Sequence, residues 1–299
     1  MKLLAIGEVM AEISGDAESG FSVGFAGDTF NTAVYCARAL GEAGSVGYMT
    51  RIGPDSLSAA MLERLRDEGI SDAKIGFDEH RNLGIYSVAT DADGERSFHY
   101  WRNQSAARGL FSDDADLDQL ADAEIIYLSA ITLAILSPSA RQRLADRLAA
   151  LRDHGRALIA FDSNFRPKLW EDVETARSVT SQFWNLAHIA LPSVDDEMSL
   201  YNETAEQVVA RFSRRDWKAC AIKQGAIGPL SPTLSLRDCP EFSPVENVVD
   251  TTAAGDSFNA GYLAAFLTGE DEATCLMSGH ELASKVVQIQ GAIAPRPSQ

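Results

Sequence analysis

The feature that most constrains the fold is a regular alternation of short apolar runs with longer segments whose apolar residues recur every three to four positions. Runs of this length suit strands buried on both faces, whereas the longer segments suit amphipathic helices. This alternation is typical of a parallel sheet with helices on both faces. The sequence therefore predicts one α/β domain over residues 1–299, with a doubly wound sheet.

The alternation also gives the positions of the expected elements. Strands are predicted at residues 3–6, 46–52, 125–128, 157–161, 188–191 and 219–222. Helices are predicted at residues 29–40, 56–68, 138–154, 205–212, 256–267 and 272–290.

One region breaks the alternation. Residues 85–102 have the pattern of two strands around the turn Asp91-Ala92-Asp93-Gly94, which favours a hairpin. Together with a segment near the N-terminus, this hairpin predicts a small β-sheet lid formed by residues 14–25 and 84–102. A lid of this kind can exclude water from a site beneath it.

Composition narrows the partners and the compartment. A net charge of −17 argues against nucleic acid or an anionic membrane surface, since both would repel the chain. The longest nearly apolar run, residues 125–136, is shorter than the roughly 20 residues needed to span a bilayer. The four cysteines are scattered and have no CxxC spacing, which fits a reducing compartment. We therefore expect a cytoplasmic protein that acts on small molecules.

The common nucleotide-binding motifs, GxxxxGK[ST] and GxGxxG after the first strand, are missing, as are the HRD and DFG triplets of protein kinases. Polar and glycine-rich segments instead follow several predicted strands, and the carboxyl ends of parallel strands meet at one edge of a sheet. In "DTTAAGDSFNAG", residues 250–261, small residues would let a ligand approach the backbone where a helix begins. An ordinary capped helix is the alternative interpretation of that stretch.

Taken together, these segments resemble the ribokinase-like (PfkB) sugar kinases over nearly the whole chain. The segments are AGDTFN at 26–31, YWR at 100–102, DSNFRPKLW at 162–170, KQGAIG at 223–228 and DTTAAGDSFNAGY at 250–262. Within that family, GDTFN, YWR and SNFRPKLW are most similar to the kinases of 2-keto-3-deoxygluconate. The resemblance implies ATP-dependent phosphorylation of this sugar acid to 2-keto-3-deoxy-6-phosphogluconate, with ATP and Mg²⁺ as cofactors.

The resemblance also implies roles for individual residues. Asp256 would be the general base, and the N–H groups of Ala253, Ala254 and Gly255 would form an anion hole for the transferring phosphate. The sugar acid would be bound by Gly27, Asp28 and Asn31, by Tyr86 and Tyr100 of the lid, and by Arg102 and Arg166 at its carboxylate. ATP would be bound by Asn164, Ser193, Lys223, Gly225 and Gly228.

This chain departs from the family pattern at two points. The family often has glycine where this chain has Ala253. The family's Asn-x-x-Glu motif, which is linked to magnesium, appears here as Ser193-Val194-Asp195-Asp196 with Glu197 one place later. The carboxylate associated with magnesium is therefore either Asp196 or Glu197.

Two other functions remain open. A fructokinase or another neutral-sugar kinase of the same family would not need the arginine pair. A catalytically silent sugar or nucleotide sensor would share the fold, although the presence of Asp256 argues against it. Exposed lid strands can also pair between two subunits by edge addition, so a homo-oligomer formed through the lid is a further expectation.

Overall fold

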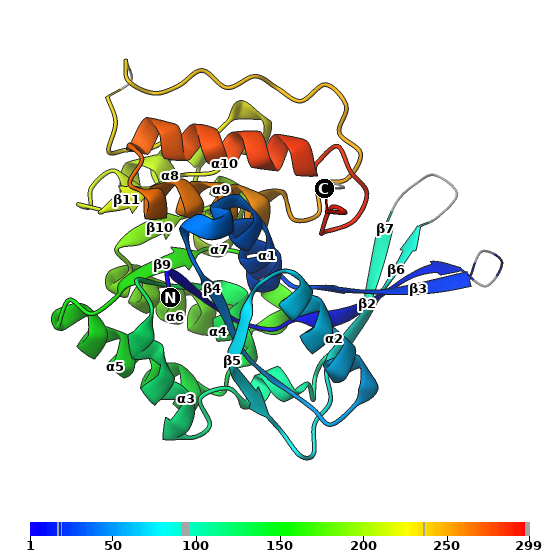
Figure 1. The fold of residues 1–299 in the computed structure, drawn as a ribbon. Helices are drawn as coiled ribbons and strands as arrows, with labels where there is room; N and C mark the ends of the chain where they lie inside the picture. The colour runs from blue at the N-terminus through cyan, green and yellow to red at the C-terminus, as the bar shows by residue number, and fades with distance from the viewer. Residues whose placement is uncertain (17, 19, 91–95, 236, 297–299) are drawn as a thin grey trace.

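The computed structural model describes residues 1–16, 18, 20–90, 96–235 and 237–296 (Figure 1). Its main body is built on a seven-stranded sheet in the order β11-β10-β9-β8-β1-β4-β5. Every neighbouring pair in this sheet is parallel. The strands are β1 (Leu3–Ile6), β4 (Val46–Ile52), β5 (Ser71–Phe77), β8 (Ile125–Ser129), β9 (Leu158–Asp162), β10 (Ile189–Leu191) and β11 (Ala219–Cys220).

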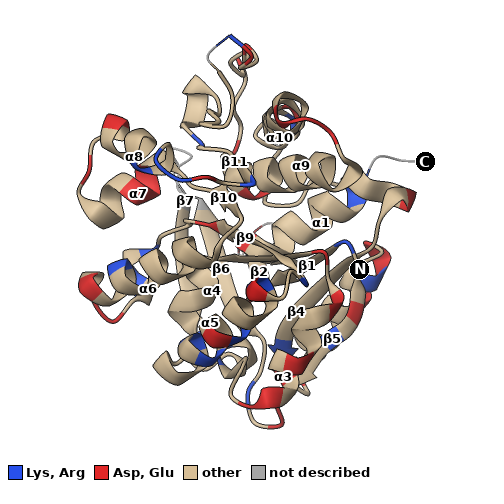
Figure 2. Ribbon diagram, turned by 90° about the vertical axis from the view of Figure 1, so that its left-hand side faces the viewer, with Lys and Arg blue, Asp and Glu red and all other residues tan. Residues whose placement is uncertain are grey.

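Helices cover both faces of this sheet (Figures 1 and 2). One face carries α1 (Asp28–Leu40), α2 (Ser56–Asp67), α9 (Ala254–Thr268) and α10 (Glu272–Val286). The opposite face carries α3 (Asp114–Asp118), α4 (Ala130–Ile135), α5 (Pro138–Asp153), α6 (Val173–Leu186), α7 (Val194–Tyr201) and α8 (Ala205–Phe212). Short 3-10 helices are η1 (Gly41–Ala43), η2 (Ala106–Gly109), η3 (Gln119–Asp122), η4 (Pro167–Leu169) and η5 (Gly225–Ile227). Within the described part of the chain, no helix is both long and apolar enough to cross a membrane.

The core lies in two layers because successive strand residues point to opposite faces of the sheet. On β1, Leu4 and Ile6 belong to the core layer that contains α4 to α8, whereas Leu3 and Ala5 belong to the layer that contains α1, α2, α9 and α10. All four of these side chains are fully buried. Burial on both faces is typical of a parallel sheet between helices, and it explains the unbroken apolar strand sequences. The predicted doubly wound fold is confirmed.

Each predicted strand and helix is present. The largest difference at an end is in α10, which stops at Val286 rather than at residue 290. The sequence analysis missed β5, α3, α4, α6 and α7. For α6 the sequence does contain a helical pattern that was missed. Its residues Ala176, Thr180, Phe183 and Trp184 recur at intervals of about three to four and are buried on one face of the helix.

A second, four-stranded sheet forms the lid and projects from the main body (Figure 1). Its order is β3-β2-β6-β7, with β2 (Met10–Asp16), β3 (Gly20–Ala26), β6 (Gly84–Thr90) and β7 (Arg96–Trp101). The predicted turn at residues 91–94 lies outside the described residues. Because β2 follows β1 after three residues, the lid begins at the carboxyl end of the main sheet.

Candidate active site

A cleft of about 1030 Å³ lies at the carboxyl edge of the main sheet, between the body and the lid. The lid contributes Tyr86 and Tyr100, and the body contributes Asp28, Asp196 and Asp256. This volume is at the upper end of the roughly 300–1,000 Å³ found for small-molecule sites, so the cleft has room for two substrates. The predicted site segments therefore converge on one cleft, although they come from distant parts of the sequence.

The start of α9 forms one wall of this cleft. Ala253 is the N-cap residue, with a left-handed backbone at φ 62°. Glycine adopts this conformation more easily than alanine, which explains why glycine suits this position. The N–H of Ala254 donates to Thr251 O at 3.2 Å, so it is already used within the turn. The following N–H groups, of Gly255 and Asp256, lie in the first turn, where a helix has no internal acceptors for them. They are better placed than Ala254 to bind an anion.

Asp256 is almost fully buried at the base of the cleft. Its Oδ2 accepts a hydrogen bond from Asn31 Nδ2 at 2.8 Å, and its backbone oxygen accepts one from Thr32 Oγ1 at 3.1 Å. Burial raises the pKa of Asp256 well above its usual value, and the nearby Asp28 raises it further, whereas the bond from Asn31 opposes this shift. The structure thus holds a carboxylate of increased proton affinity in a fixed orientation, as a general base requires.

Asp28, at the first position of α1, is held by groups from other elements. The hydroxyl of Ser129, at the end of β8, and Asn164 Nδ2, at 3.1 Å, both donate to its Oδ2. Burial raises the pKa of Asp28 as well. Asn164 was predicted to bind ATP, but the structure places it against this carboxylate. Sequence reasoning missed Ser129.

Gly27 precedes Asp28 and is required by close packing. A Cβ at Gly27 would lie 2.2 Å from the carbonyl oxygen of Glu8, so a side chain does not fit there. Its N–H donates to Asn31 Oδ1 at 3.3 Å, which holds the Asn31 side chain in the orientation that reaches Asp256.

The two predicted carboxylate-binding arginines are held differently. Arg102 follows β7 and forms a buried ion pair with Glu8, with side chains only 7% and 1% exposed. Its Nε is buried and has no hydrogen-bond partner among the residues that the structure describes. Arg166 is 54% exposed and pairs with Asp196 at 3.2 Å. Sequence reasoning missed Glu8, although it directly follows the glycine at the end of the first strand.

Aromatic side chains of the lid line the cleft beside Arg102, whose guanidinium carbon lies 6.0 Å from the centroid of the Tyr100 ring. Tyr86 stacks on Tyr100 with ring centroids 5.7 Å apart, and the two residues are direct partners across β6 and β7. The hydroxyl of Tyr86 donates to Glu12 on β2. These predicted lid residues therefore reach the cleft as a packed pair.

The candidates for magnesium are separated by the structure. Asp196 lines the cleft, and burial raises its pKa while Arg166 opposes the shift. Glu197 points away from the cleft and is fully buried, where it accepts from Arg211 at 2.8 Å and from Trp184 Nε1 at 3.2 Å. Burial raises the pKa of Glu197 to about 7. Glu197 thus belongs to the packing of α6, α7 and α8, and of the two candidates only Asp196 fits a ligand-binding role.

The donors present suit magnesium in a nucleotide complex. Among the described residues, no group of three or more His, Cys, Asp or Glu side chains could hold a metal alone. Magnesium is usually held by one or two carboxylates together with substrate phosphates. Asp196 can supply such a carboxylate.

The predicted ATP loop is only partly in the cleft. Gly225 lines it, as do Ser193 and Lys223. Gly228 does not: a Cβ there would lie 2.8 Å from the ring of Phe242, so this glycine, at φ 96°, permits packing of the loop rather than contact with a ligand. The prediction that Gly228 binds ATP is not supported by this placement.

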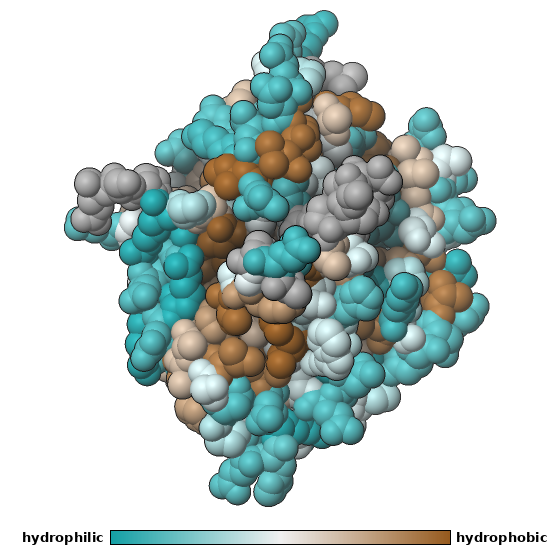
Figure 3. Space-filling model, turned by 90° about the vertical axis from the view of Figure 1, so that its right-hand side faces the viewer, coloured by the Kyte–Doolittle hydropathy of each residue, from teal (hydrophilic) through white to brown (hydrophobic). Residues whose placement is uncertain are grey.

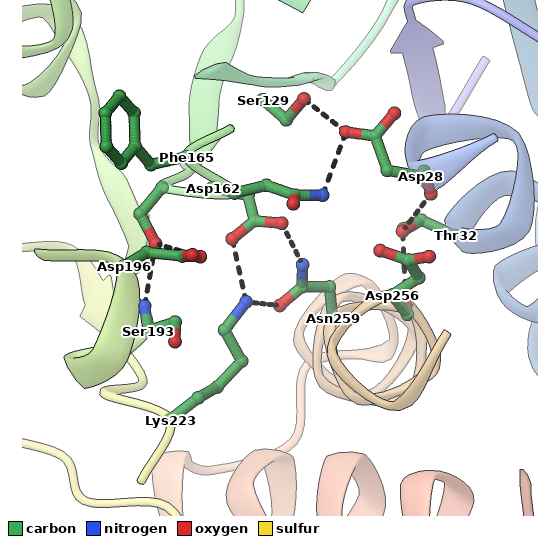
Figure 4. Close-up of polar contacts among 12 residues, drawn as sticks. Asp28, Thr32, Ser129, Asp162, Phe165, Ser193, Asp196, Lys223, Asp256 and Asn259 are labelled. Carbon is green, nitrogen blue, oxygen red and sulfur yellow. Dashed lines mark hydrogen bonds and ion pairs between the residues drawn. The ribbon is translucent and has the colours of Figure 1, made fainter. Parts of the chain in front are cut away.

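A buried polar network connects these loops beneath the cleft (Figure 4). Lys223 Nζ donates to Asp162 Oδ1 at 2.8 Å and to Asn259 Oδ1 at 3.0 Å. Asn259 Nδ2 in turn donates to Asp162 Oδ2 at 3.0 Å and to Tyr127 Oη at 3.0 Å. Sequence reasoning assigned no role to Asp162, Asn259 or Tyr127, although Asp162 and Asn259 stand inside two of the segments that carry the family resemblance.

Known proteins resemble this chain over nearly its whole length. The chain is 41% identical over 305 residues to 2-dehydro-3-deoxygluconokinase of Escherichia coli K12, covering 99% of this chain and 97% of that protein. It is 42% identical over 298 residues to 2-dehydro-3-deoxygluconokinase of Dickeya dadantii, covering 97% and 96%. A solved structure of a putative ribokinase II from E. coli, in complex with ATP and Mg²⁺, has a TM-score of 0.81 at 22% identity and covers 97% of this chain and 94% of its own.

The family itself follows from the whole chain. The family model described as pfkB family carbohydrate kinase matches residues 1–299. With this match, the ribokinase-like fold and the aspartate at the start of α9, the chain belongs to the pfkB family of carbohydrate kinases.

Proposed function

We propose that this chain transfers the γ-phosphoryl group of ATP to O6 of 2-keto-3-deoxygluconate, which is the same compound as 2-dehydro-3-deoxygluconate. Relatives of that activity are 41% and 42% identical over nearly the whole chain. The observation that carries the proposal is that one cleft holds both a buried carboxylate at a helix start, Asp256, and a buried guanidinium, Arg102. The first suits phosphoryl transfer to a hydroxyl, and the second suits recognition of a substrate carboxylate.

The chemistry at the α9 end is as follows. The sugar hydroxyl oxygen forms a bond to the γ-phosphorus, the bond from that phosphorus to the oxygen bridging to ADP breaks, and the hydroxyl proton passes to Asp256. The first-turn N–H groups of Gly255 and Asp256 donate to the phosphoryl oxygens, where helix-start N–H groups stabilise negative charge. Asp28 and Asn31 orient the sugar next to the base. When bound, Mg²⁺ neutralises phosphate charge, and Asp196 would hold it.

Arg102 and Glu8, which both line the cleft, form a neutral pair. A guanidinium has five N–H donors, so pairing with Glu8 leaves donors for a second carboxylate. The unpartnered Nε among them would gain its acceptor when the sugar acid binds. Arg166 is a further cation that lines this cleft, and Tyr86 and Tyr100 would cover the sugar from the lid.

We also propose that two copies of the chain pair through the outer face of the lid. The register places Phe21, Val23 and Trp101 on the face opposite Tyr86, and they are 67%, 55% and 62% exposed. On the side from which the lid projects, hydrophobic residues gather in the middle and hydrophilic residues surround them (Figure 3). Analytical ultracentrifugation of Trp101→Glu tests this pairing. The mass of the particle in solution should be lower for the variant than for the wild type, and equal masses would contradict the proposal.

We place the reaction in the cytoplasm. All four cysteines are free, as a reducing compartment would leave them.

An assay of ADP release over a panel of keto-deoxy sugar acids and neutral sugars tests the function. We expect 2-keto-3-deoxygluconate to give the highest kcat/KM, with a single phosphate ester at O6 identified by NMR. A preference for fructose would instead make the chain a neutral-sugar kinase. No ADP release with any sugar would favour a sensor.

A further inference from the structure

We propose that Lys223 contacts the transferring phosphoryl group itself and that Asp162 and Asn259 position its ammonium. This inference rests on the proposed kinase function, because it assigns a role within phosphoryl transfer. It differs from the sequence prediction that Lys223 merely binds ATP along a loop.

The first observation is how Lys223 is fixed. It lies just beyond β11, and backbone bonds to Pro192 O and from Val194 N hold it beside Ser193. Its side chain is 12% exposed and ends between Asp162 and Asn259 on the side of α9 (Figure 4). An ammonium has three N–H donors, and these two partners use two of them. For the third, the described residues offer no acceptor within hydrogen-bond distance.

The second observation is where the ammonium points. A Cβ added to Gly255 would meet Lys223 Nζ at 3.8 Å, and no other heavy atom outside the local helix backbone within 4 Å. The charge therefore lies beside the first-turn N–H groups of α9, in the open space that a side chain at residue 255 would fill. A phosphoryl group bound by those N–H groups would be adjacent to it.

The third observation is the charge of the cleft. Asp28, Asp162, Asp196 and Asp256 all line it, so a phosphate group would enter a negative site. Four cations are found among the described cleft-lining residues: besides Lys223, Arg102 pairs with Glu8, Arg166 pairs with Asp196, and Lys168 lies in η4. Lys223 is the cation whose charge acts on both Asp256 and Asp196, since it lowers the pKa of each.

A purely structural role explains these contacts poorly. A buried Lys–Asp pair is a weak source of stability, because desolvation of both charges offsets their attraction. Asn259 Nδ2 donates both to Asp162 and to the hydroxyl of Tyr127. The network therefore fixes the position of the ammonium. A fixed cation that needs no reorganisation is what stabilises a charged transition state.

Binding of two nucleotides tests the contact without any sugar. In Lys223→Met, we expect the Kd of the ATP analogue AMP-PNP to rise about tenfold or more, the effect of losing a hydrogen bond to a charged group, while the Kd of ADP changes less than about threefold. Lys218→Met is the matched control, since the same change is made at an exposed lysine. Equal weakening of both nucleotides would overturn the proposal, because Lys223 would then contact only the part that they share. This result is independent of the identity of the sugar.

Turnover separates the charge from the packing. Lys223→Met should lower kcat about 10²-fold or more with the KM of the sugar within a few-fold. Because this variant leaves Asp162 unpaired, the double variant Lys223→Met/Asp162→Asn removes both charges. We expect it to melt at a higher temperature than the single variant and to stay as slow. Recovery of kcat in the double variant would show that the single variant was slow only because of the unpaired Asp162, and would overturn the proposal.

Discussion

The start of α9 and the lid contribute to the same cleft but are built in different ways. Around the α9 start, Asp256 is 9% exposed, and its side chain is bonded to a residue more than 200 positions away. On the lid, Tyr100 is 53% exposed, and its ring contacts are with residues nearby in the lid, Tyr86 and Phe98, and with Arg102 directly after β7. We infer that the groups proposed for the reaction are fixed by long-range buried contacts, whereas Tyr100, proposed to cover the sugar, lies on an exposed strand with mainly local contacts. Changes at α9 should therefore affect turnover of every sugar, and changes near the lid should depend on the sugar.

The largest effect is expected for Asp256→Asn. Asparagine keeps the size of the side chain but cannot accept the sugar proton, so kcat should fall by about 10²- to 10⁴-fold, as for loss of a general base. The melting temperature and the Kd of ATP should remain close to wild type, because removal of a buried charge does not disturb the packing. Steady-state kinetics and calorimetry measure both, and a kcat near that of the wild type would contradict the assigned role.

The next largest effect is expected for Arg102→Ala. In the complex, Arg102 would pair with the carboxylate of the sugar acid. Loss of one partner from such a desolvated pair costs about 2 to 5 kcal/mol, so the KM for 2-keto-3-deoxygluconate should rise about 30-fold or more. The KM for ATP should stay within a few-fold.

A second variant controls for the unpaired Glu8 that Arg102→Ala leaves behind. In Glu8→Gln/Arg102→Ala the buried charge is removed, so thermal stability should recover while the KM stays high. If the KM recovered together with the stability, Arg102 would be a structural residue and would not read the carboxylate.

A smaller effect concerns pH. The base must be ionised, so kcat rises as pH increases through the pKa of Asp256. Because burial raises this pKa, the rising limb of the pH profile of kcat should lie at higher pH than the pKa of a free aspartate. The negative charge of Asp28 contributes to the raised pKa, so Asp28→Asn should move the limb of kcat to lower pH. The pH profile of kcat at saturating sugar measures this shift. A limb that stays in place or moves upward would show that Asp256 does not set it.

The smallest effect is expected for Ala253→Gly. Ala253 has a left-handed backbone, which costs a non-glycine residue about 1 to 2 kcal/mol, and glycine would relieve this strain. Glycine also gives the unfolded chain more conformational freedom, which offsets about 0.4 to 1 kcal/mol of that gain. The free energy of unfolding in urea should therefore rise by no more than about 1 kcal/mol, with kcat within twofold of wild type. A marked loss of stability would mean that the methyl group of Ala253 packs usefully against its neighbours.

The sequence predicted the main sheet because strands buried on both faces have an unmistakable apolar pattern, as in Leu3–Ile6. It also predicted that the cleft-lining residues would converge, since parallel strands end at one edge. It did not predict pairs made across the fold, such as Arg102 with Glu8 or Lys223 with Asp162, because a carboxylate in a motif gives no sign of which distant cation it meets. The choice between Asp196 and Glu197 also required the structure. Adjacent residues on a helix point to different sides, and the sequence does not show which side faces the cleft.

The most direct test of the division between the two regions is the ratio of kcat/KM for 2-keto-3-deoxygluconate to that for fructose, measured in the wild type, Asp256→Asn and Arg102→Ala. The account predicts a ratio well above one in the wild type, a ratio unchanged within about threefold in Asp256→Asn, and a fall of about 30-fold or more in Arg102→Ala. Equal losses on both sugars in Arg102→Ala would contradict the account, because the cleft would then not distinguish a sugar acid by its carboxylate.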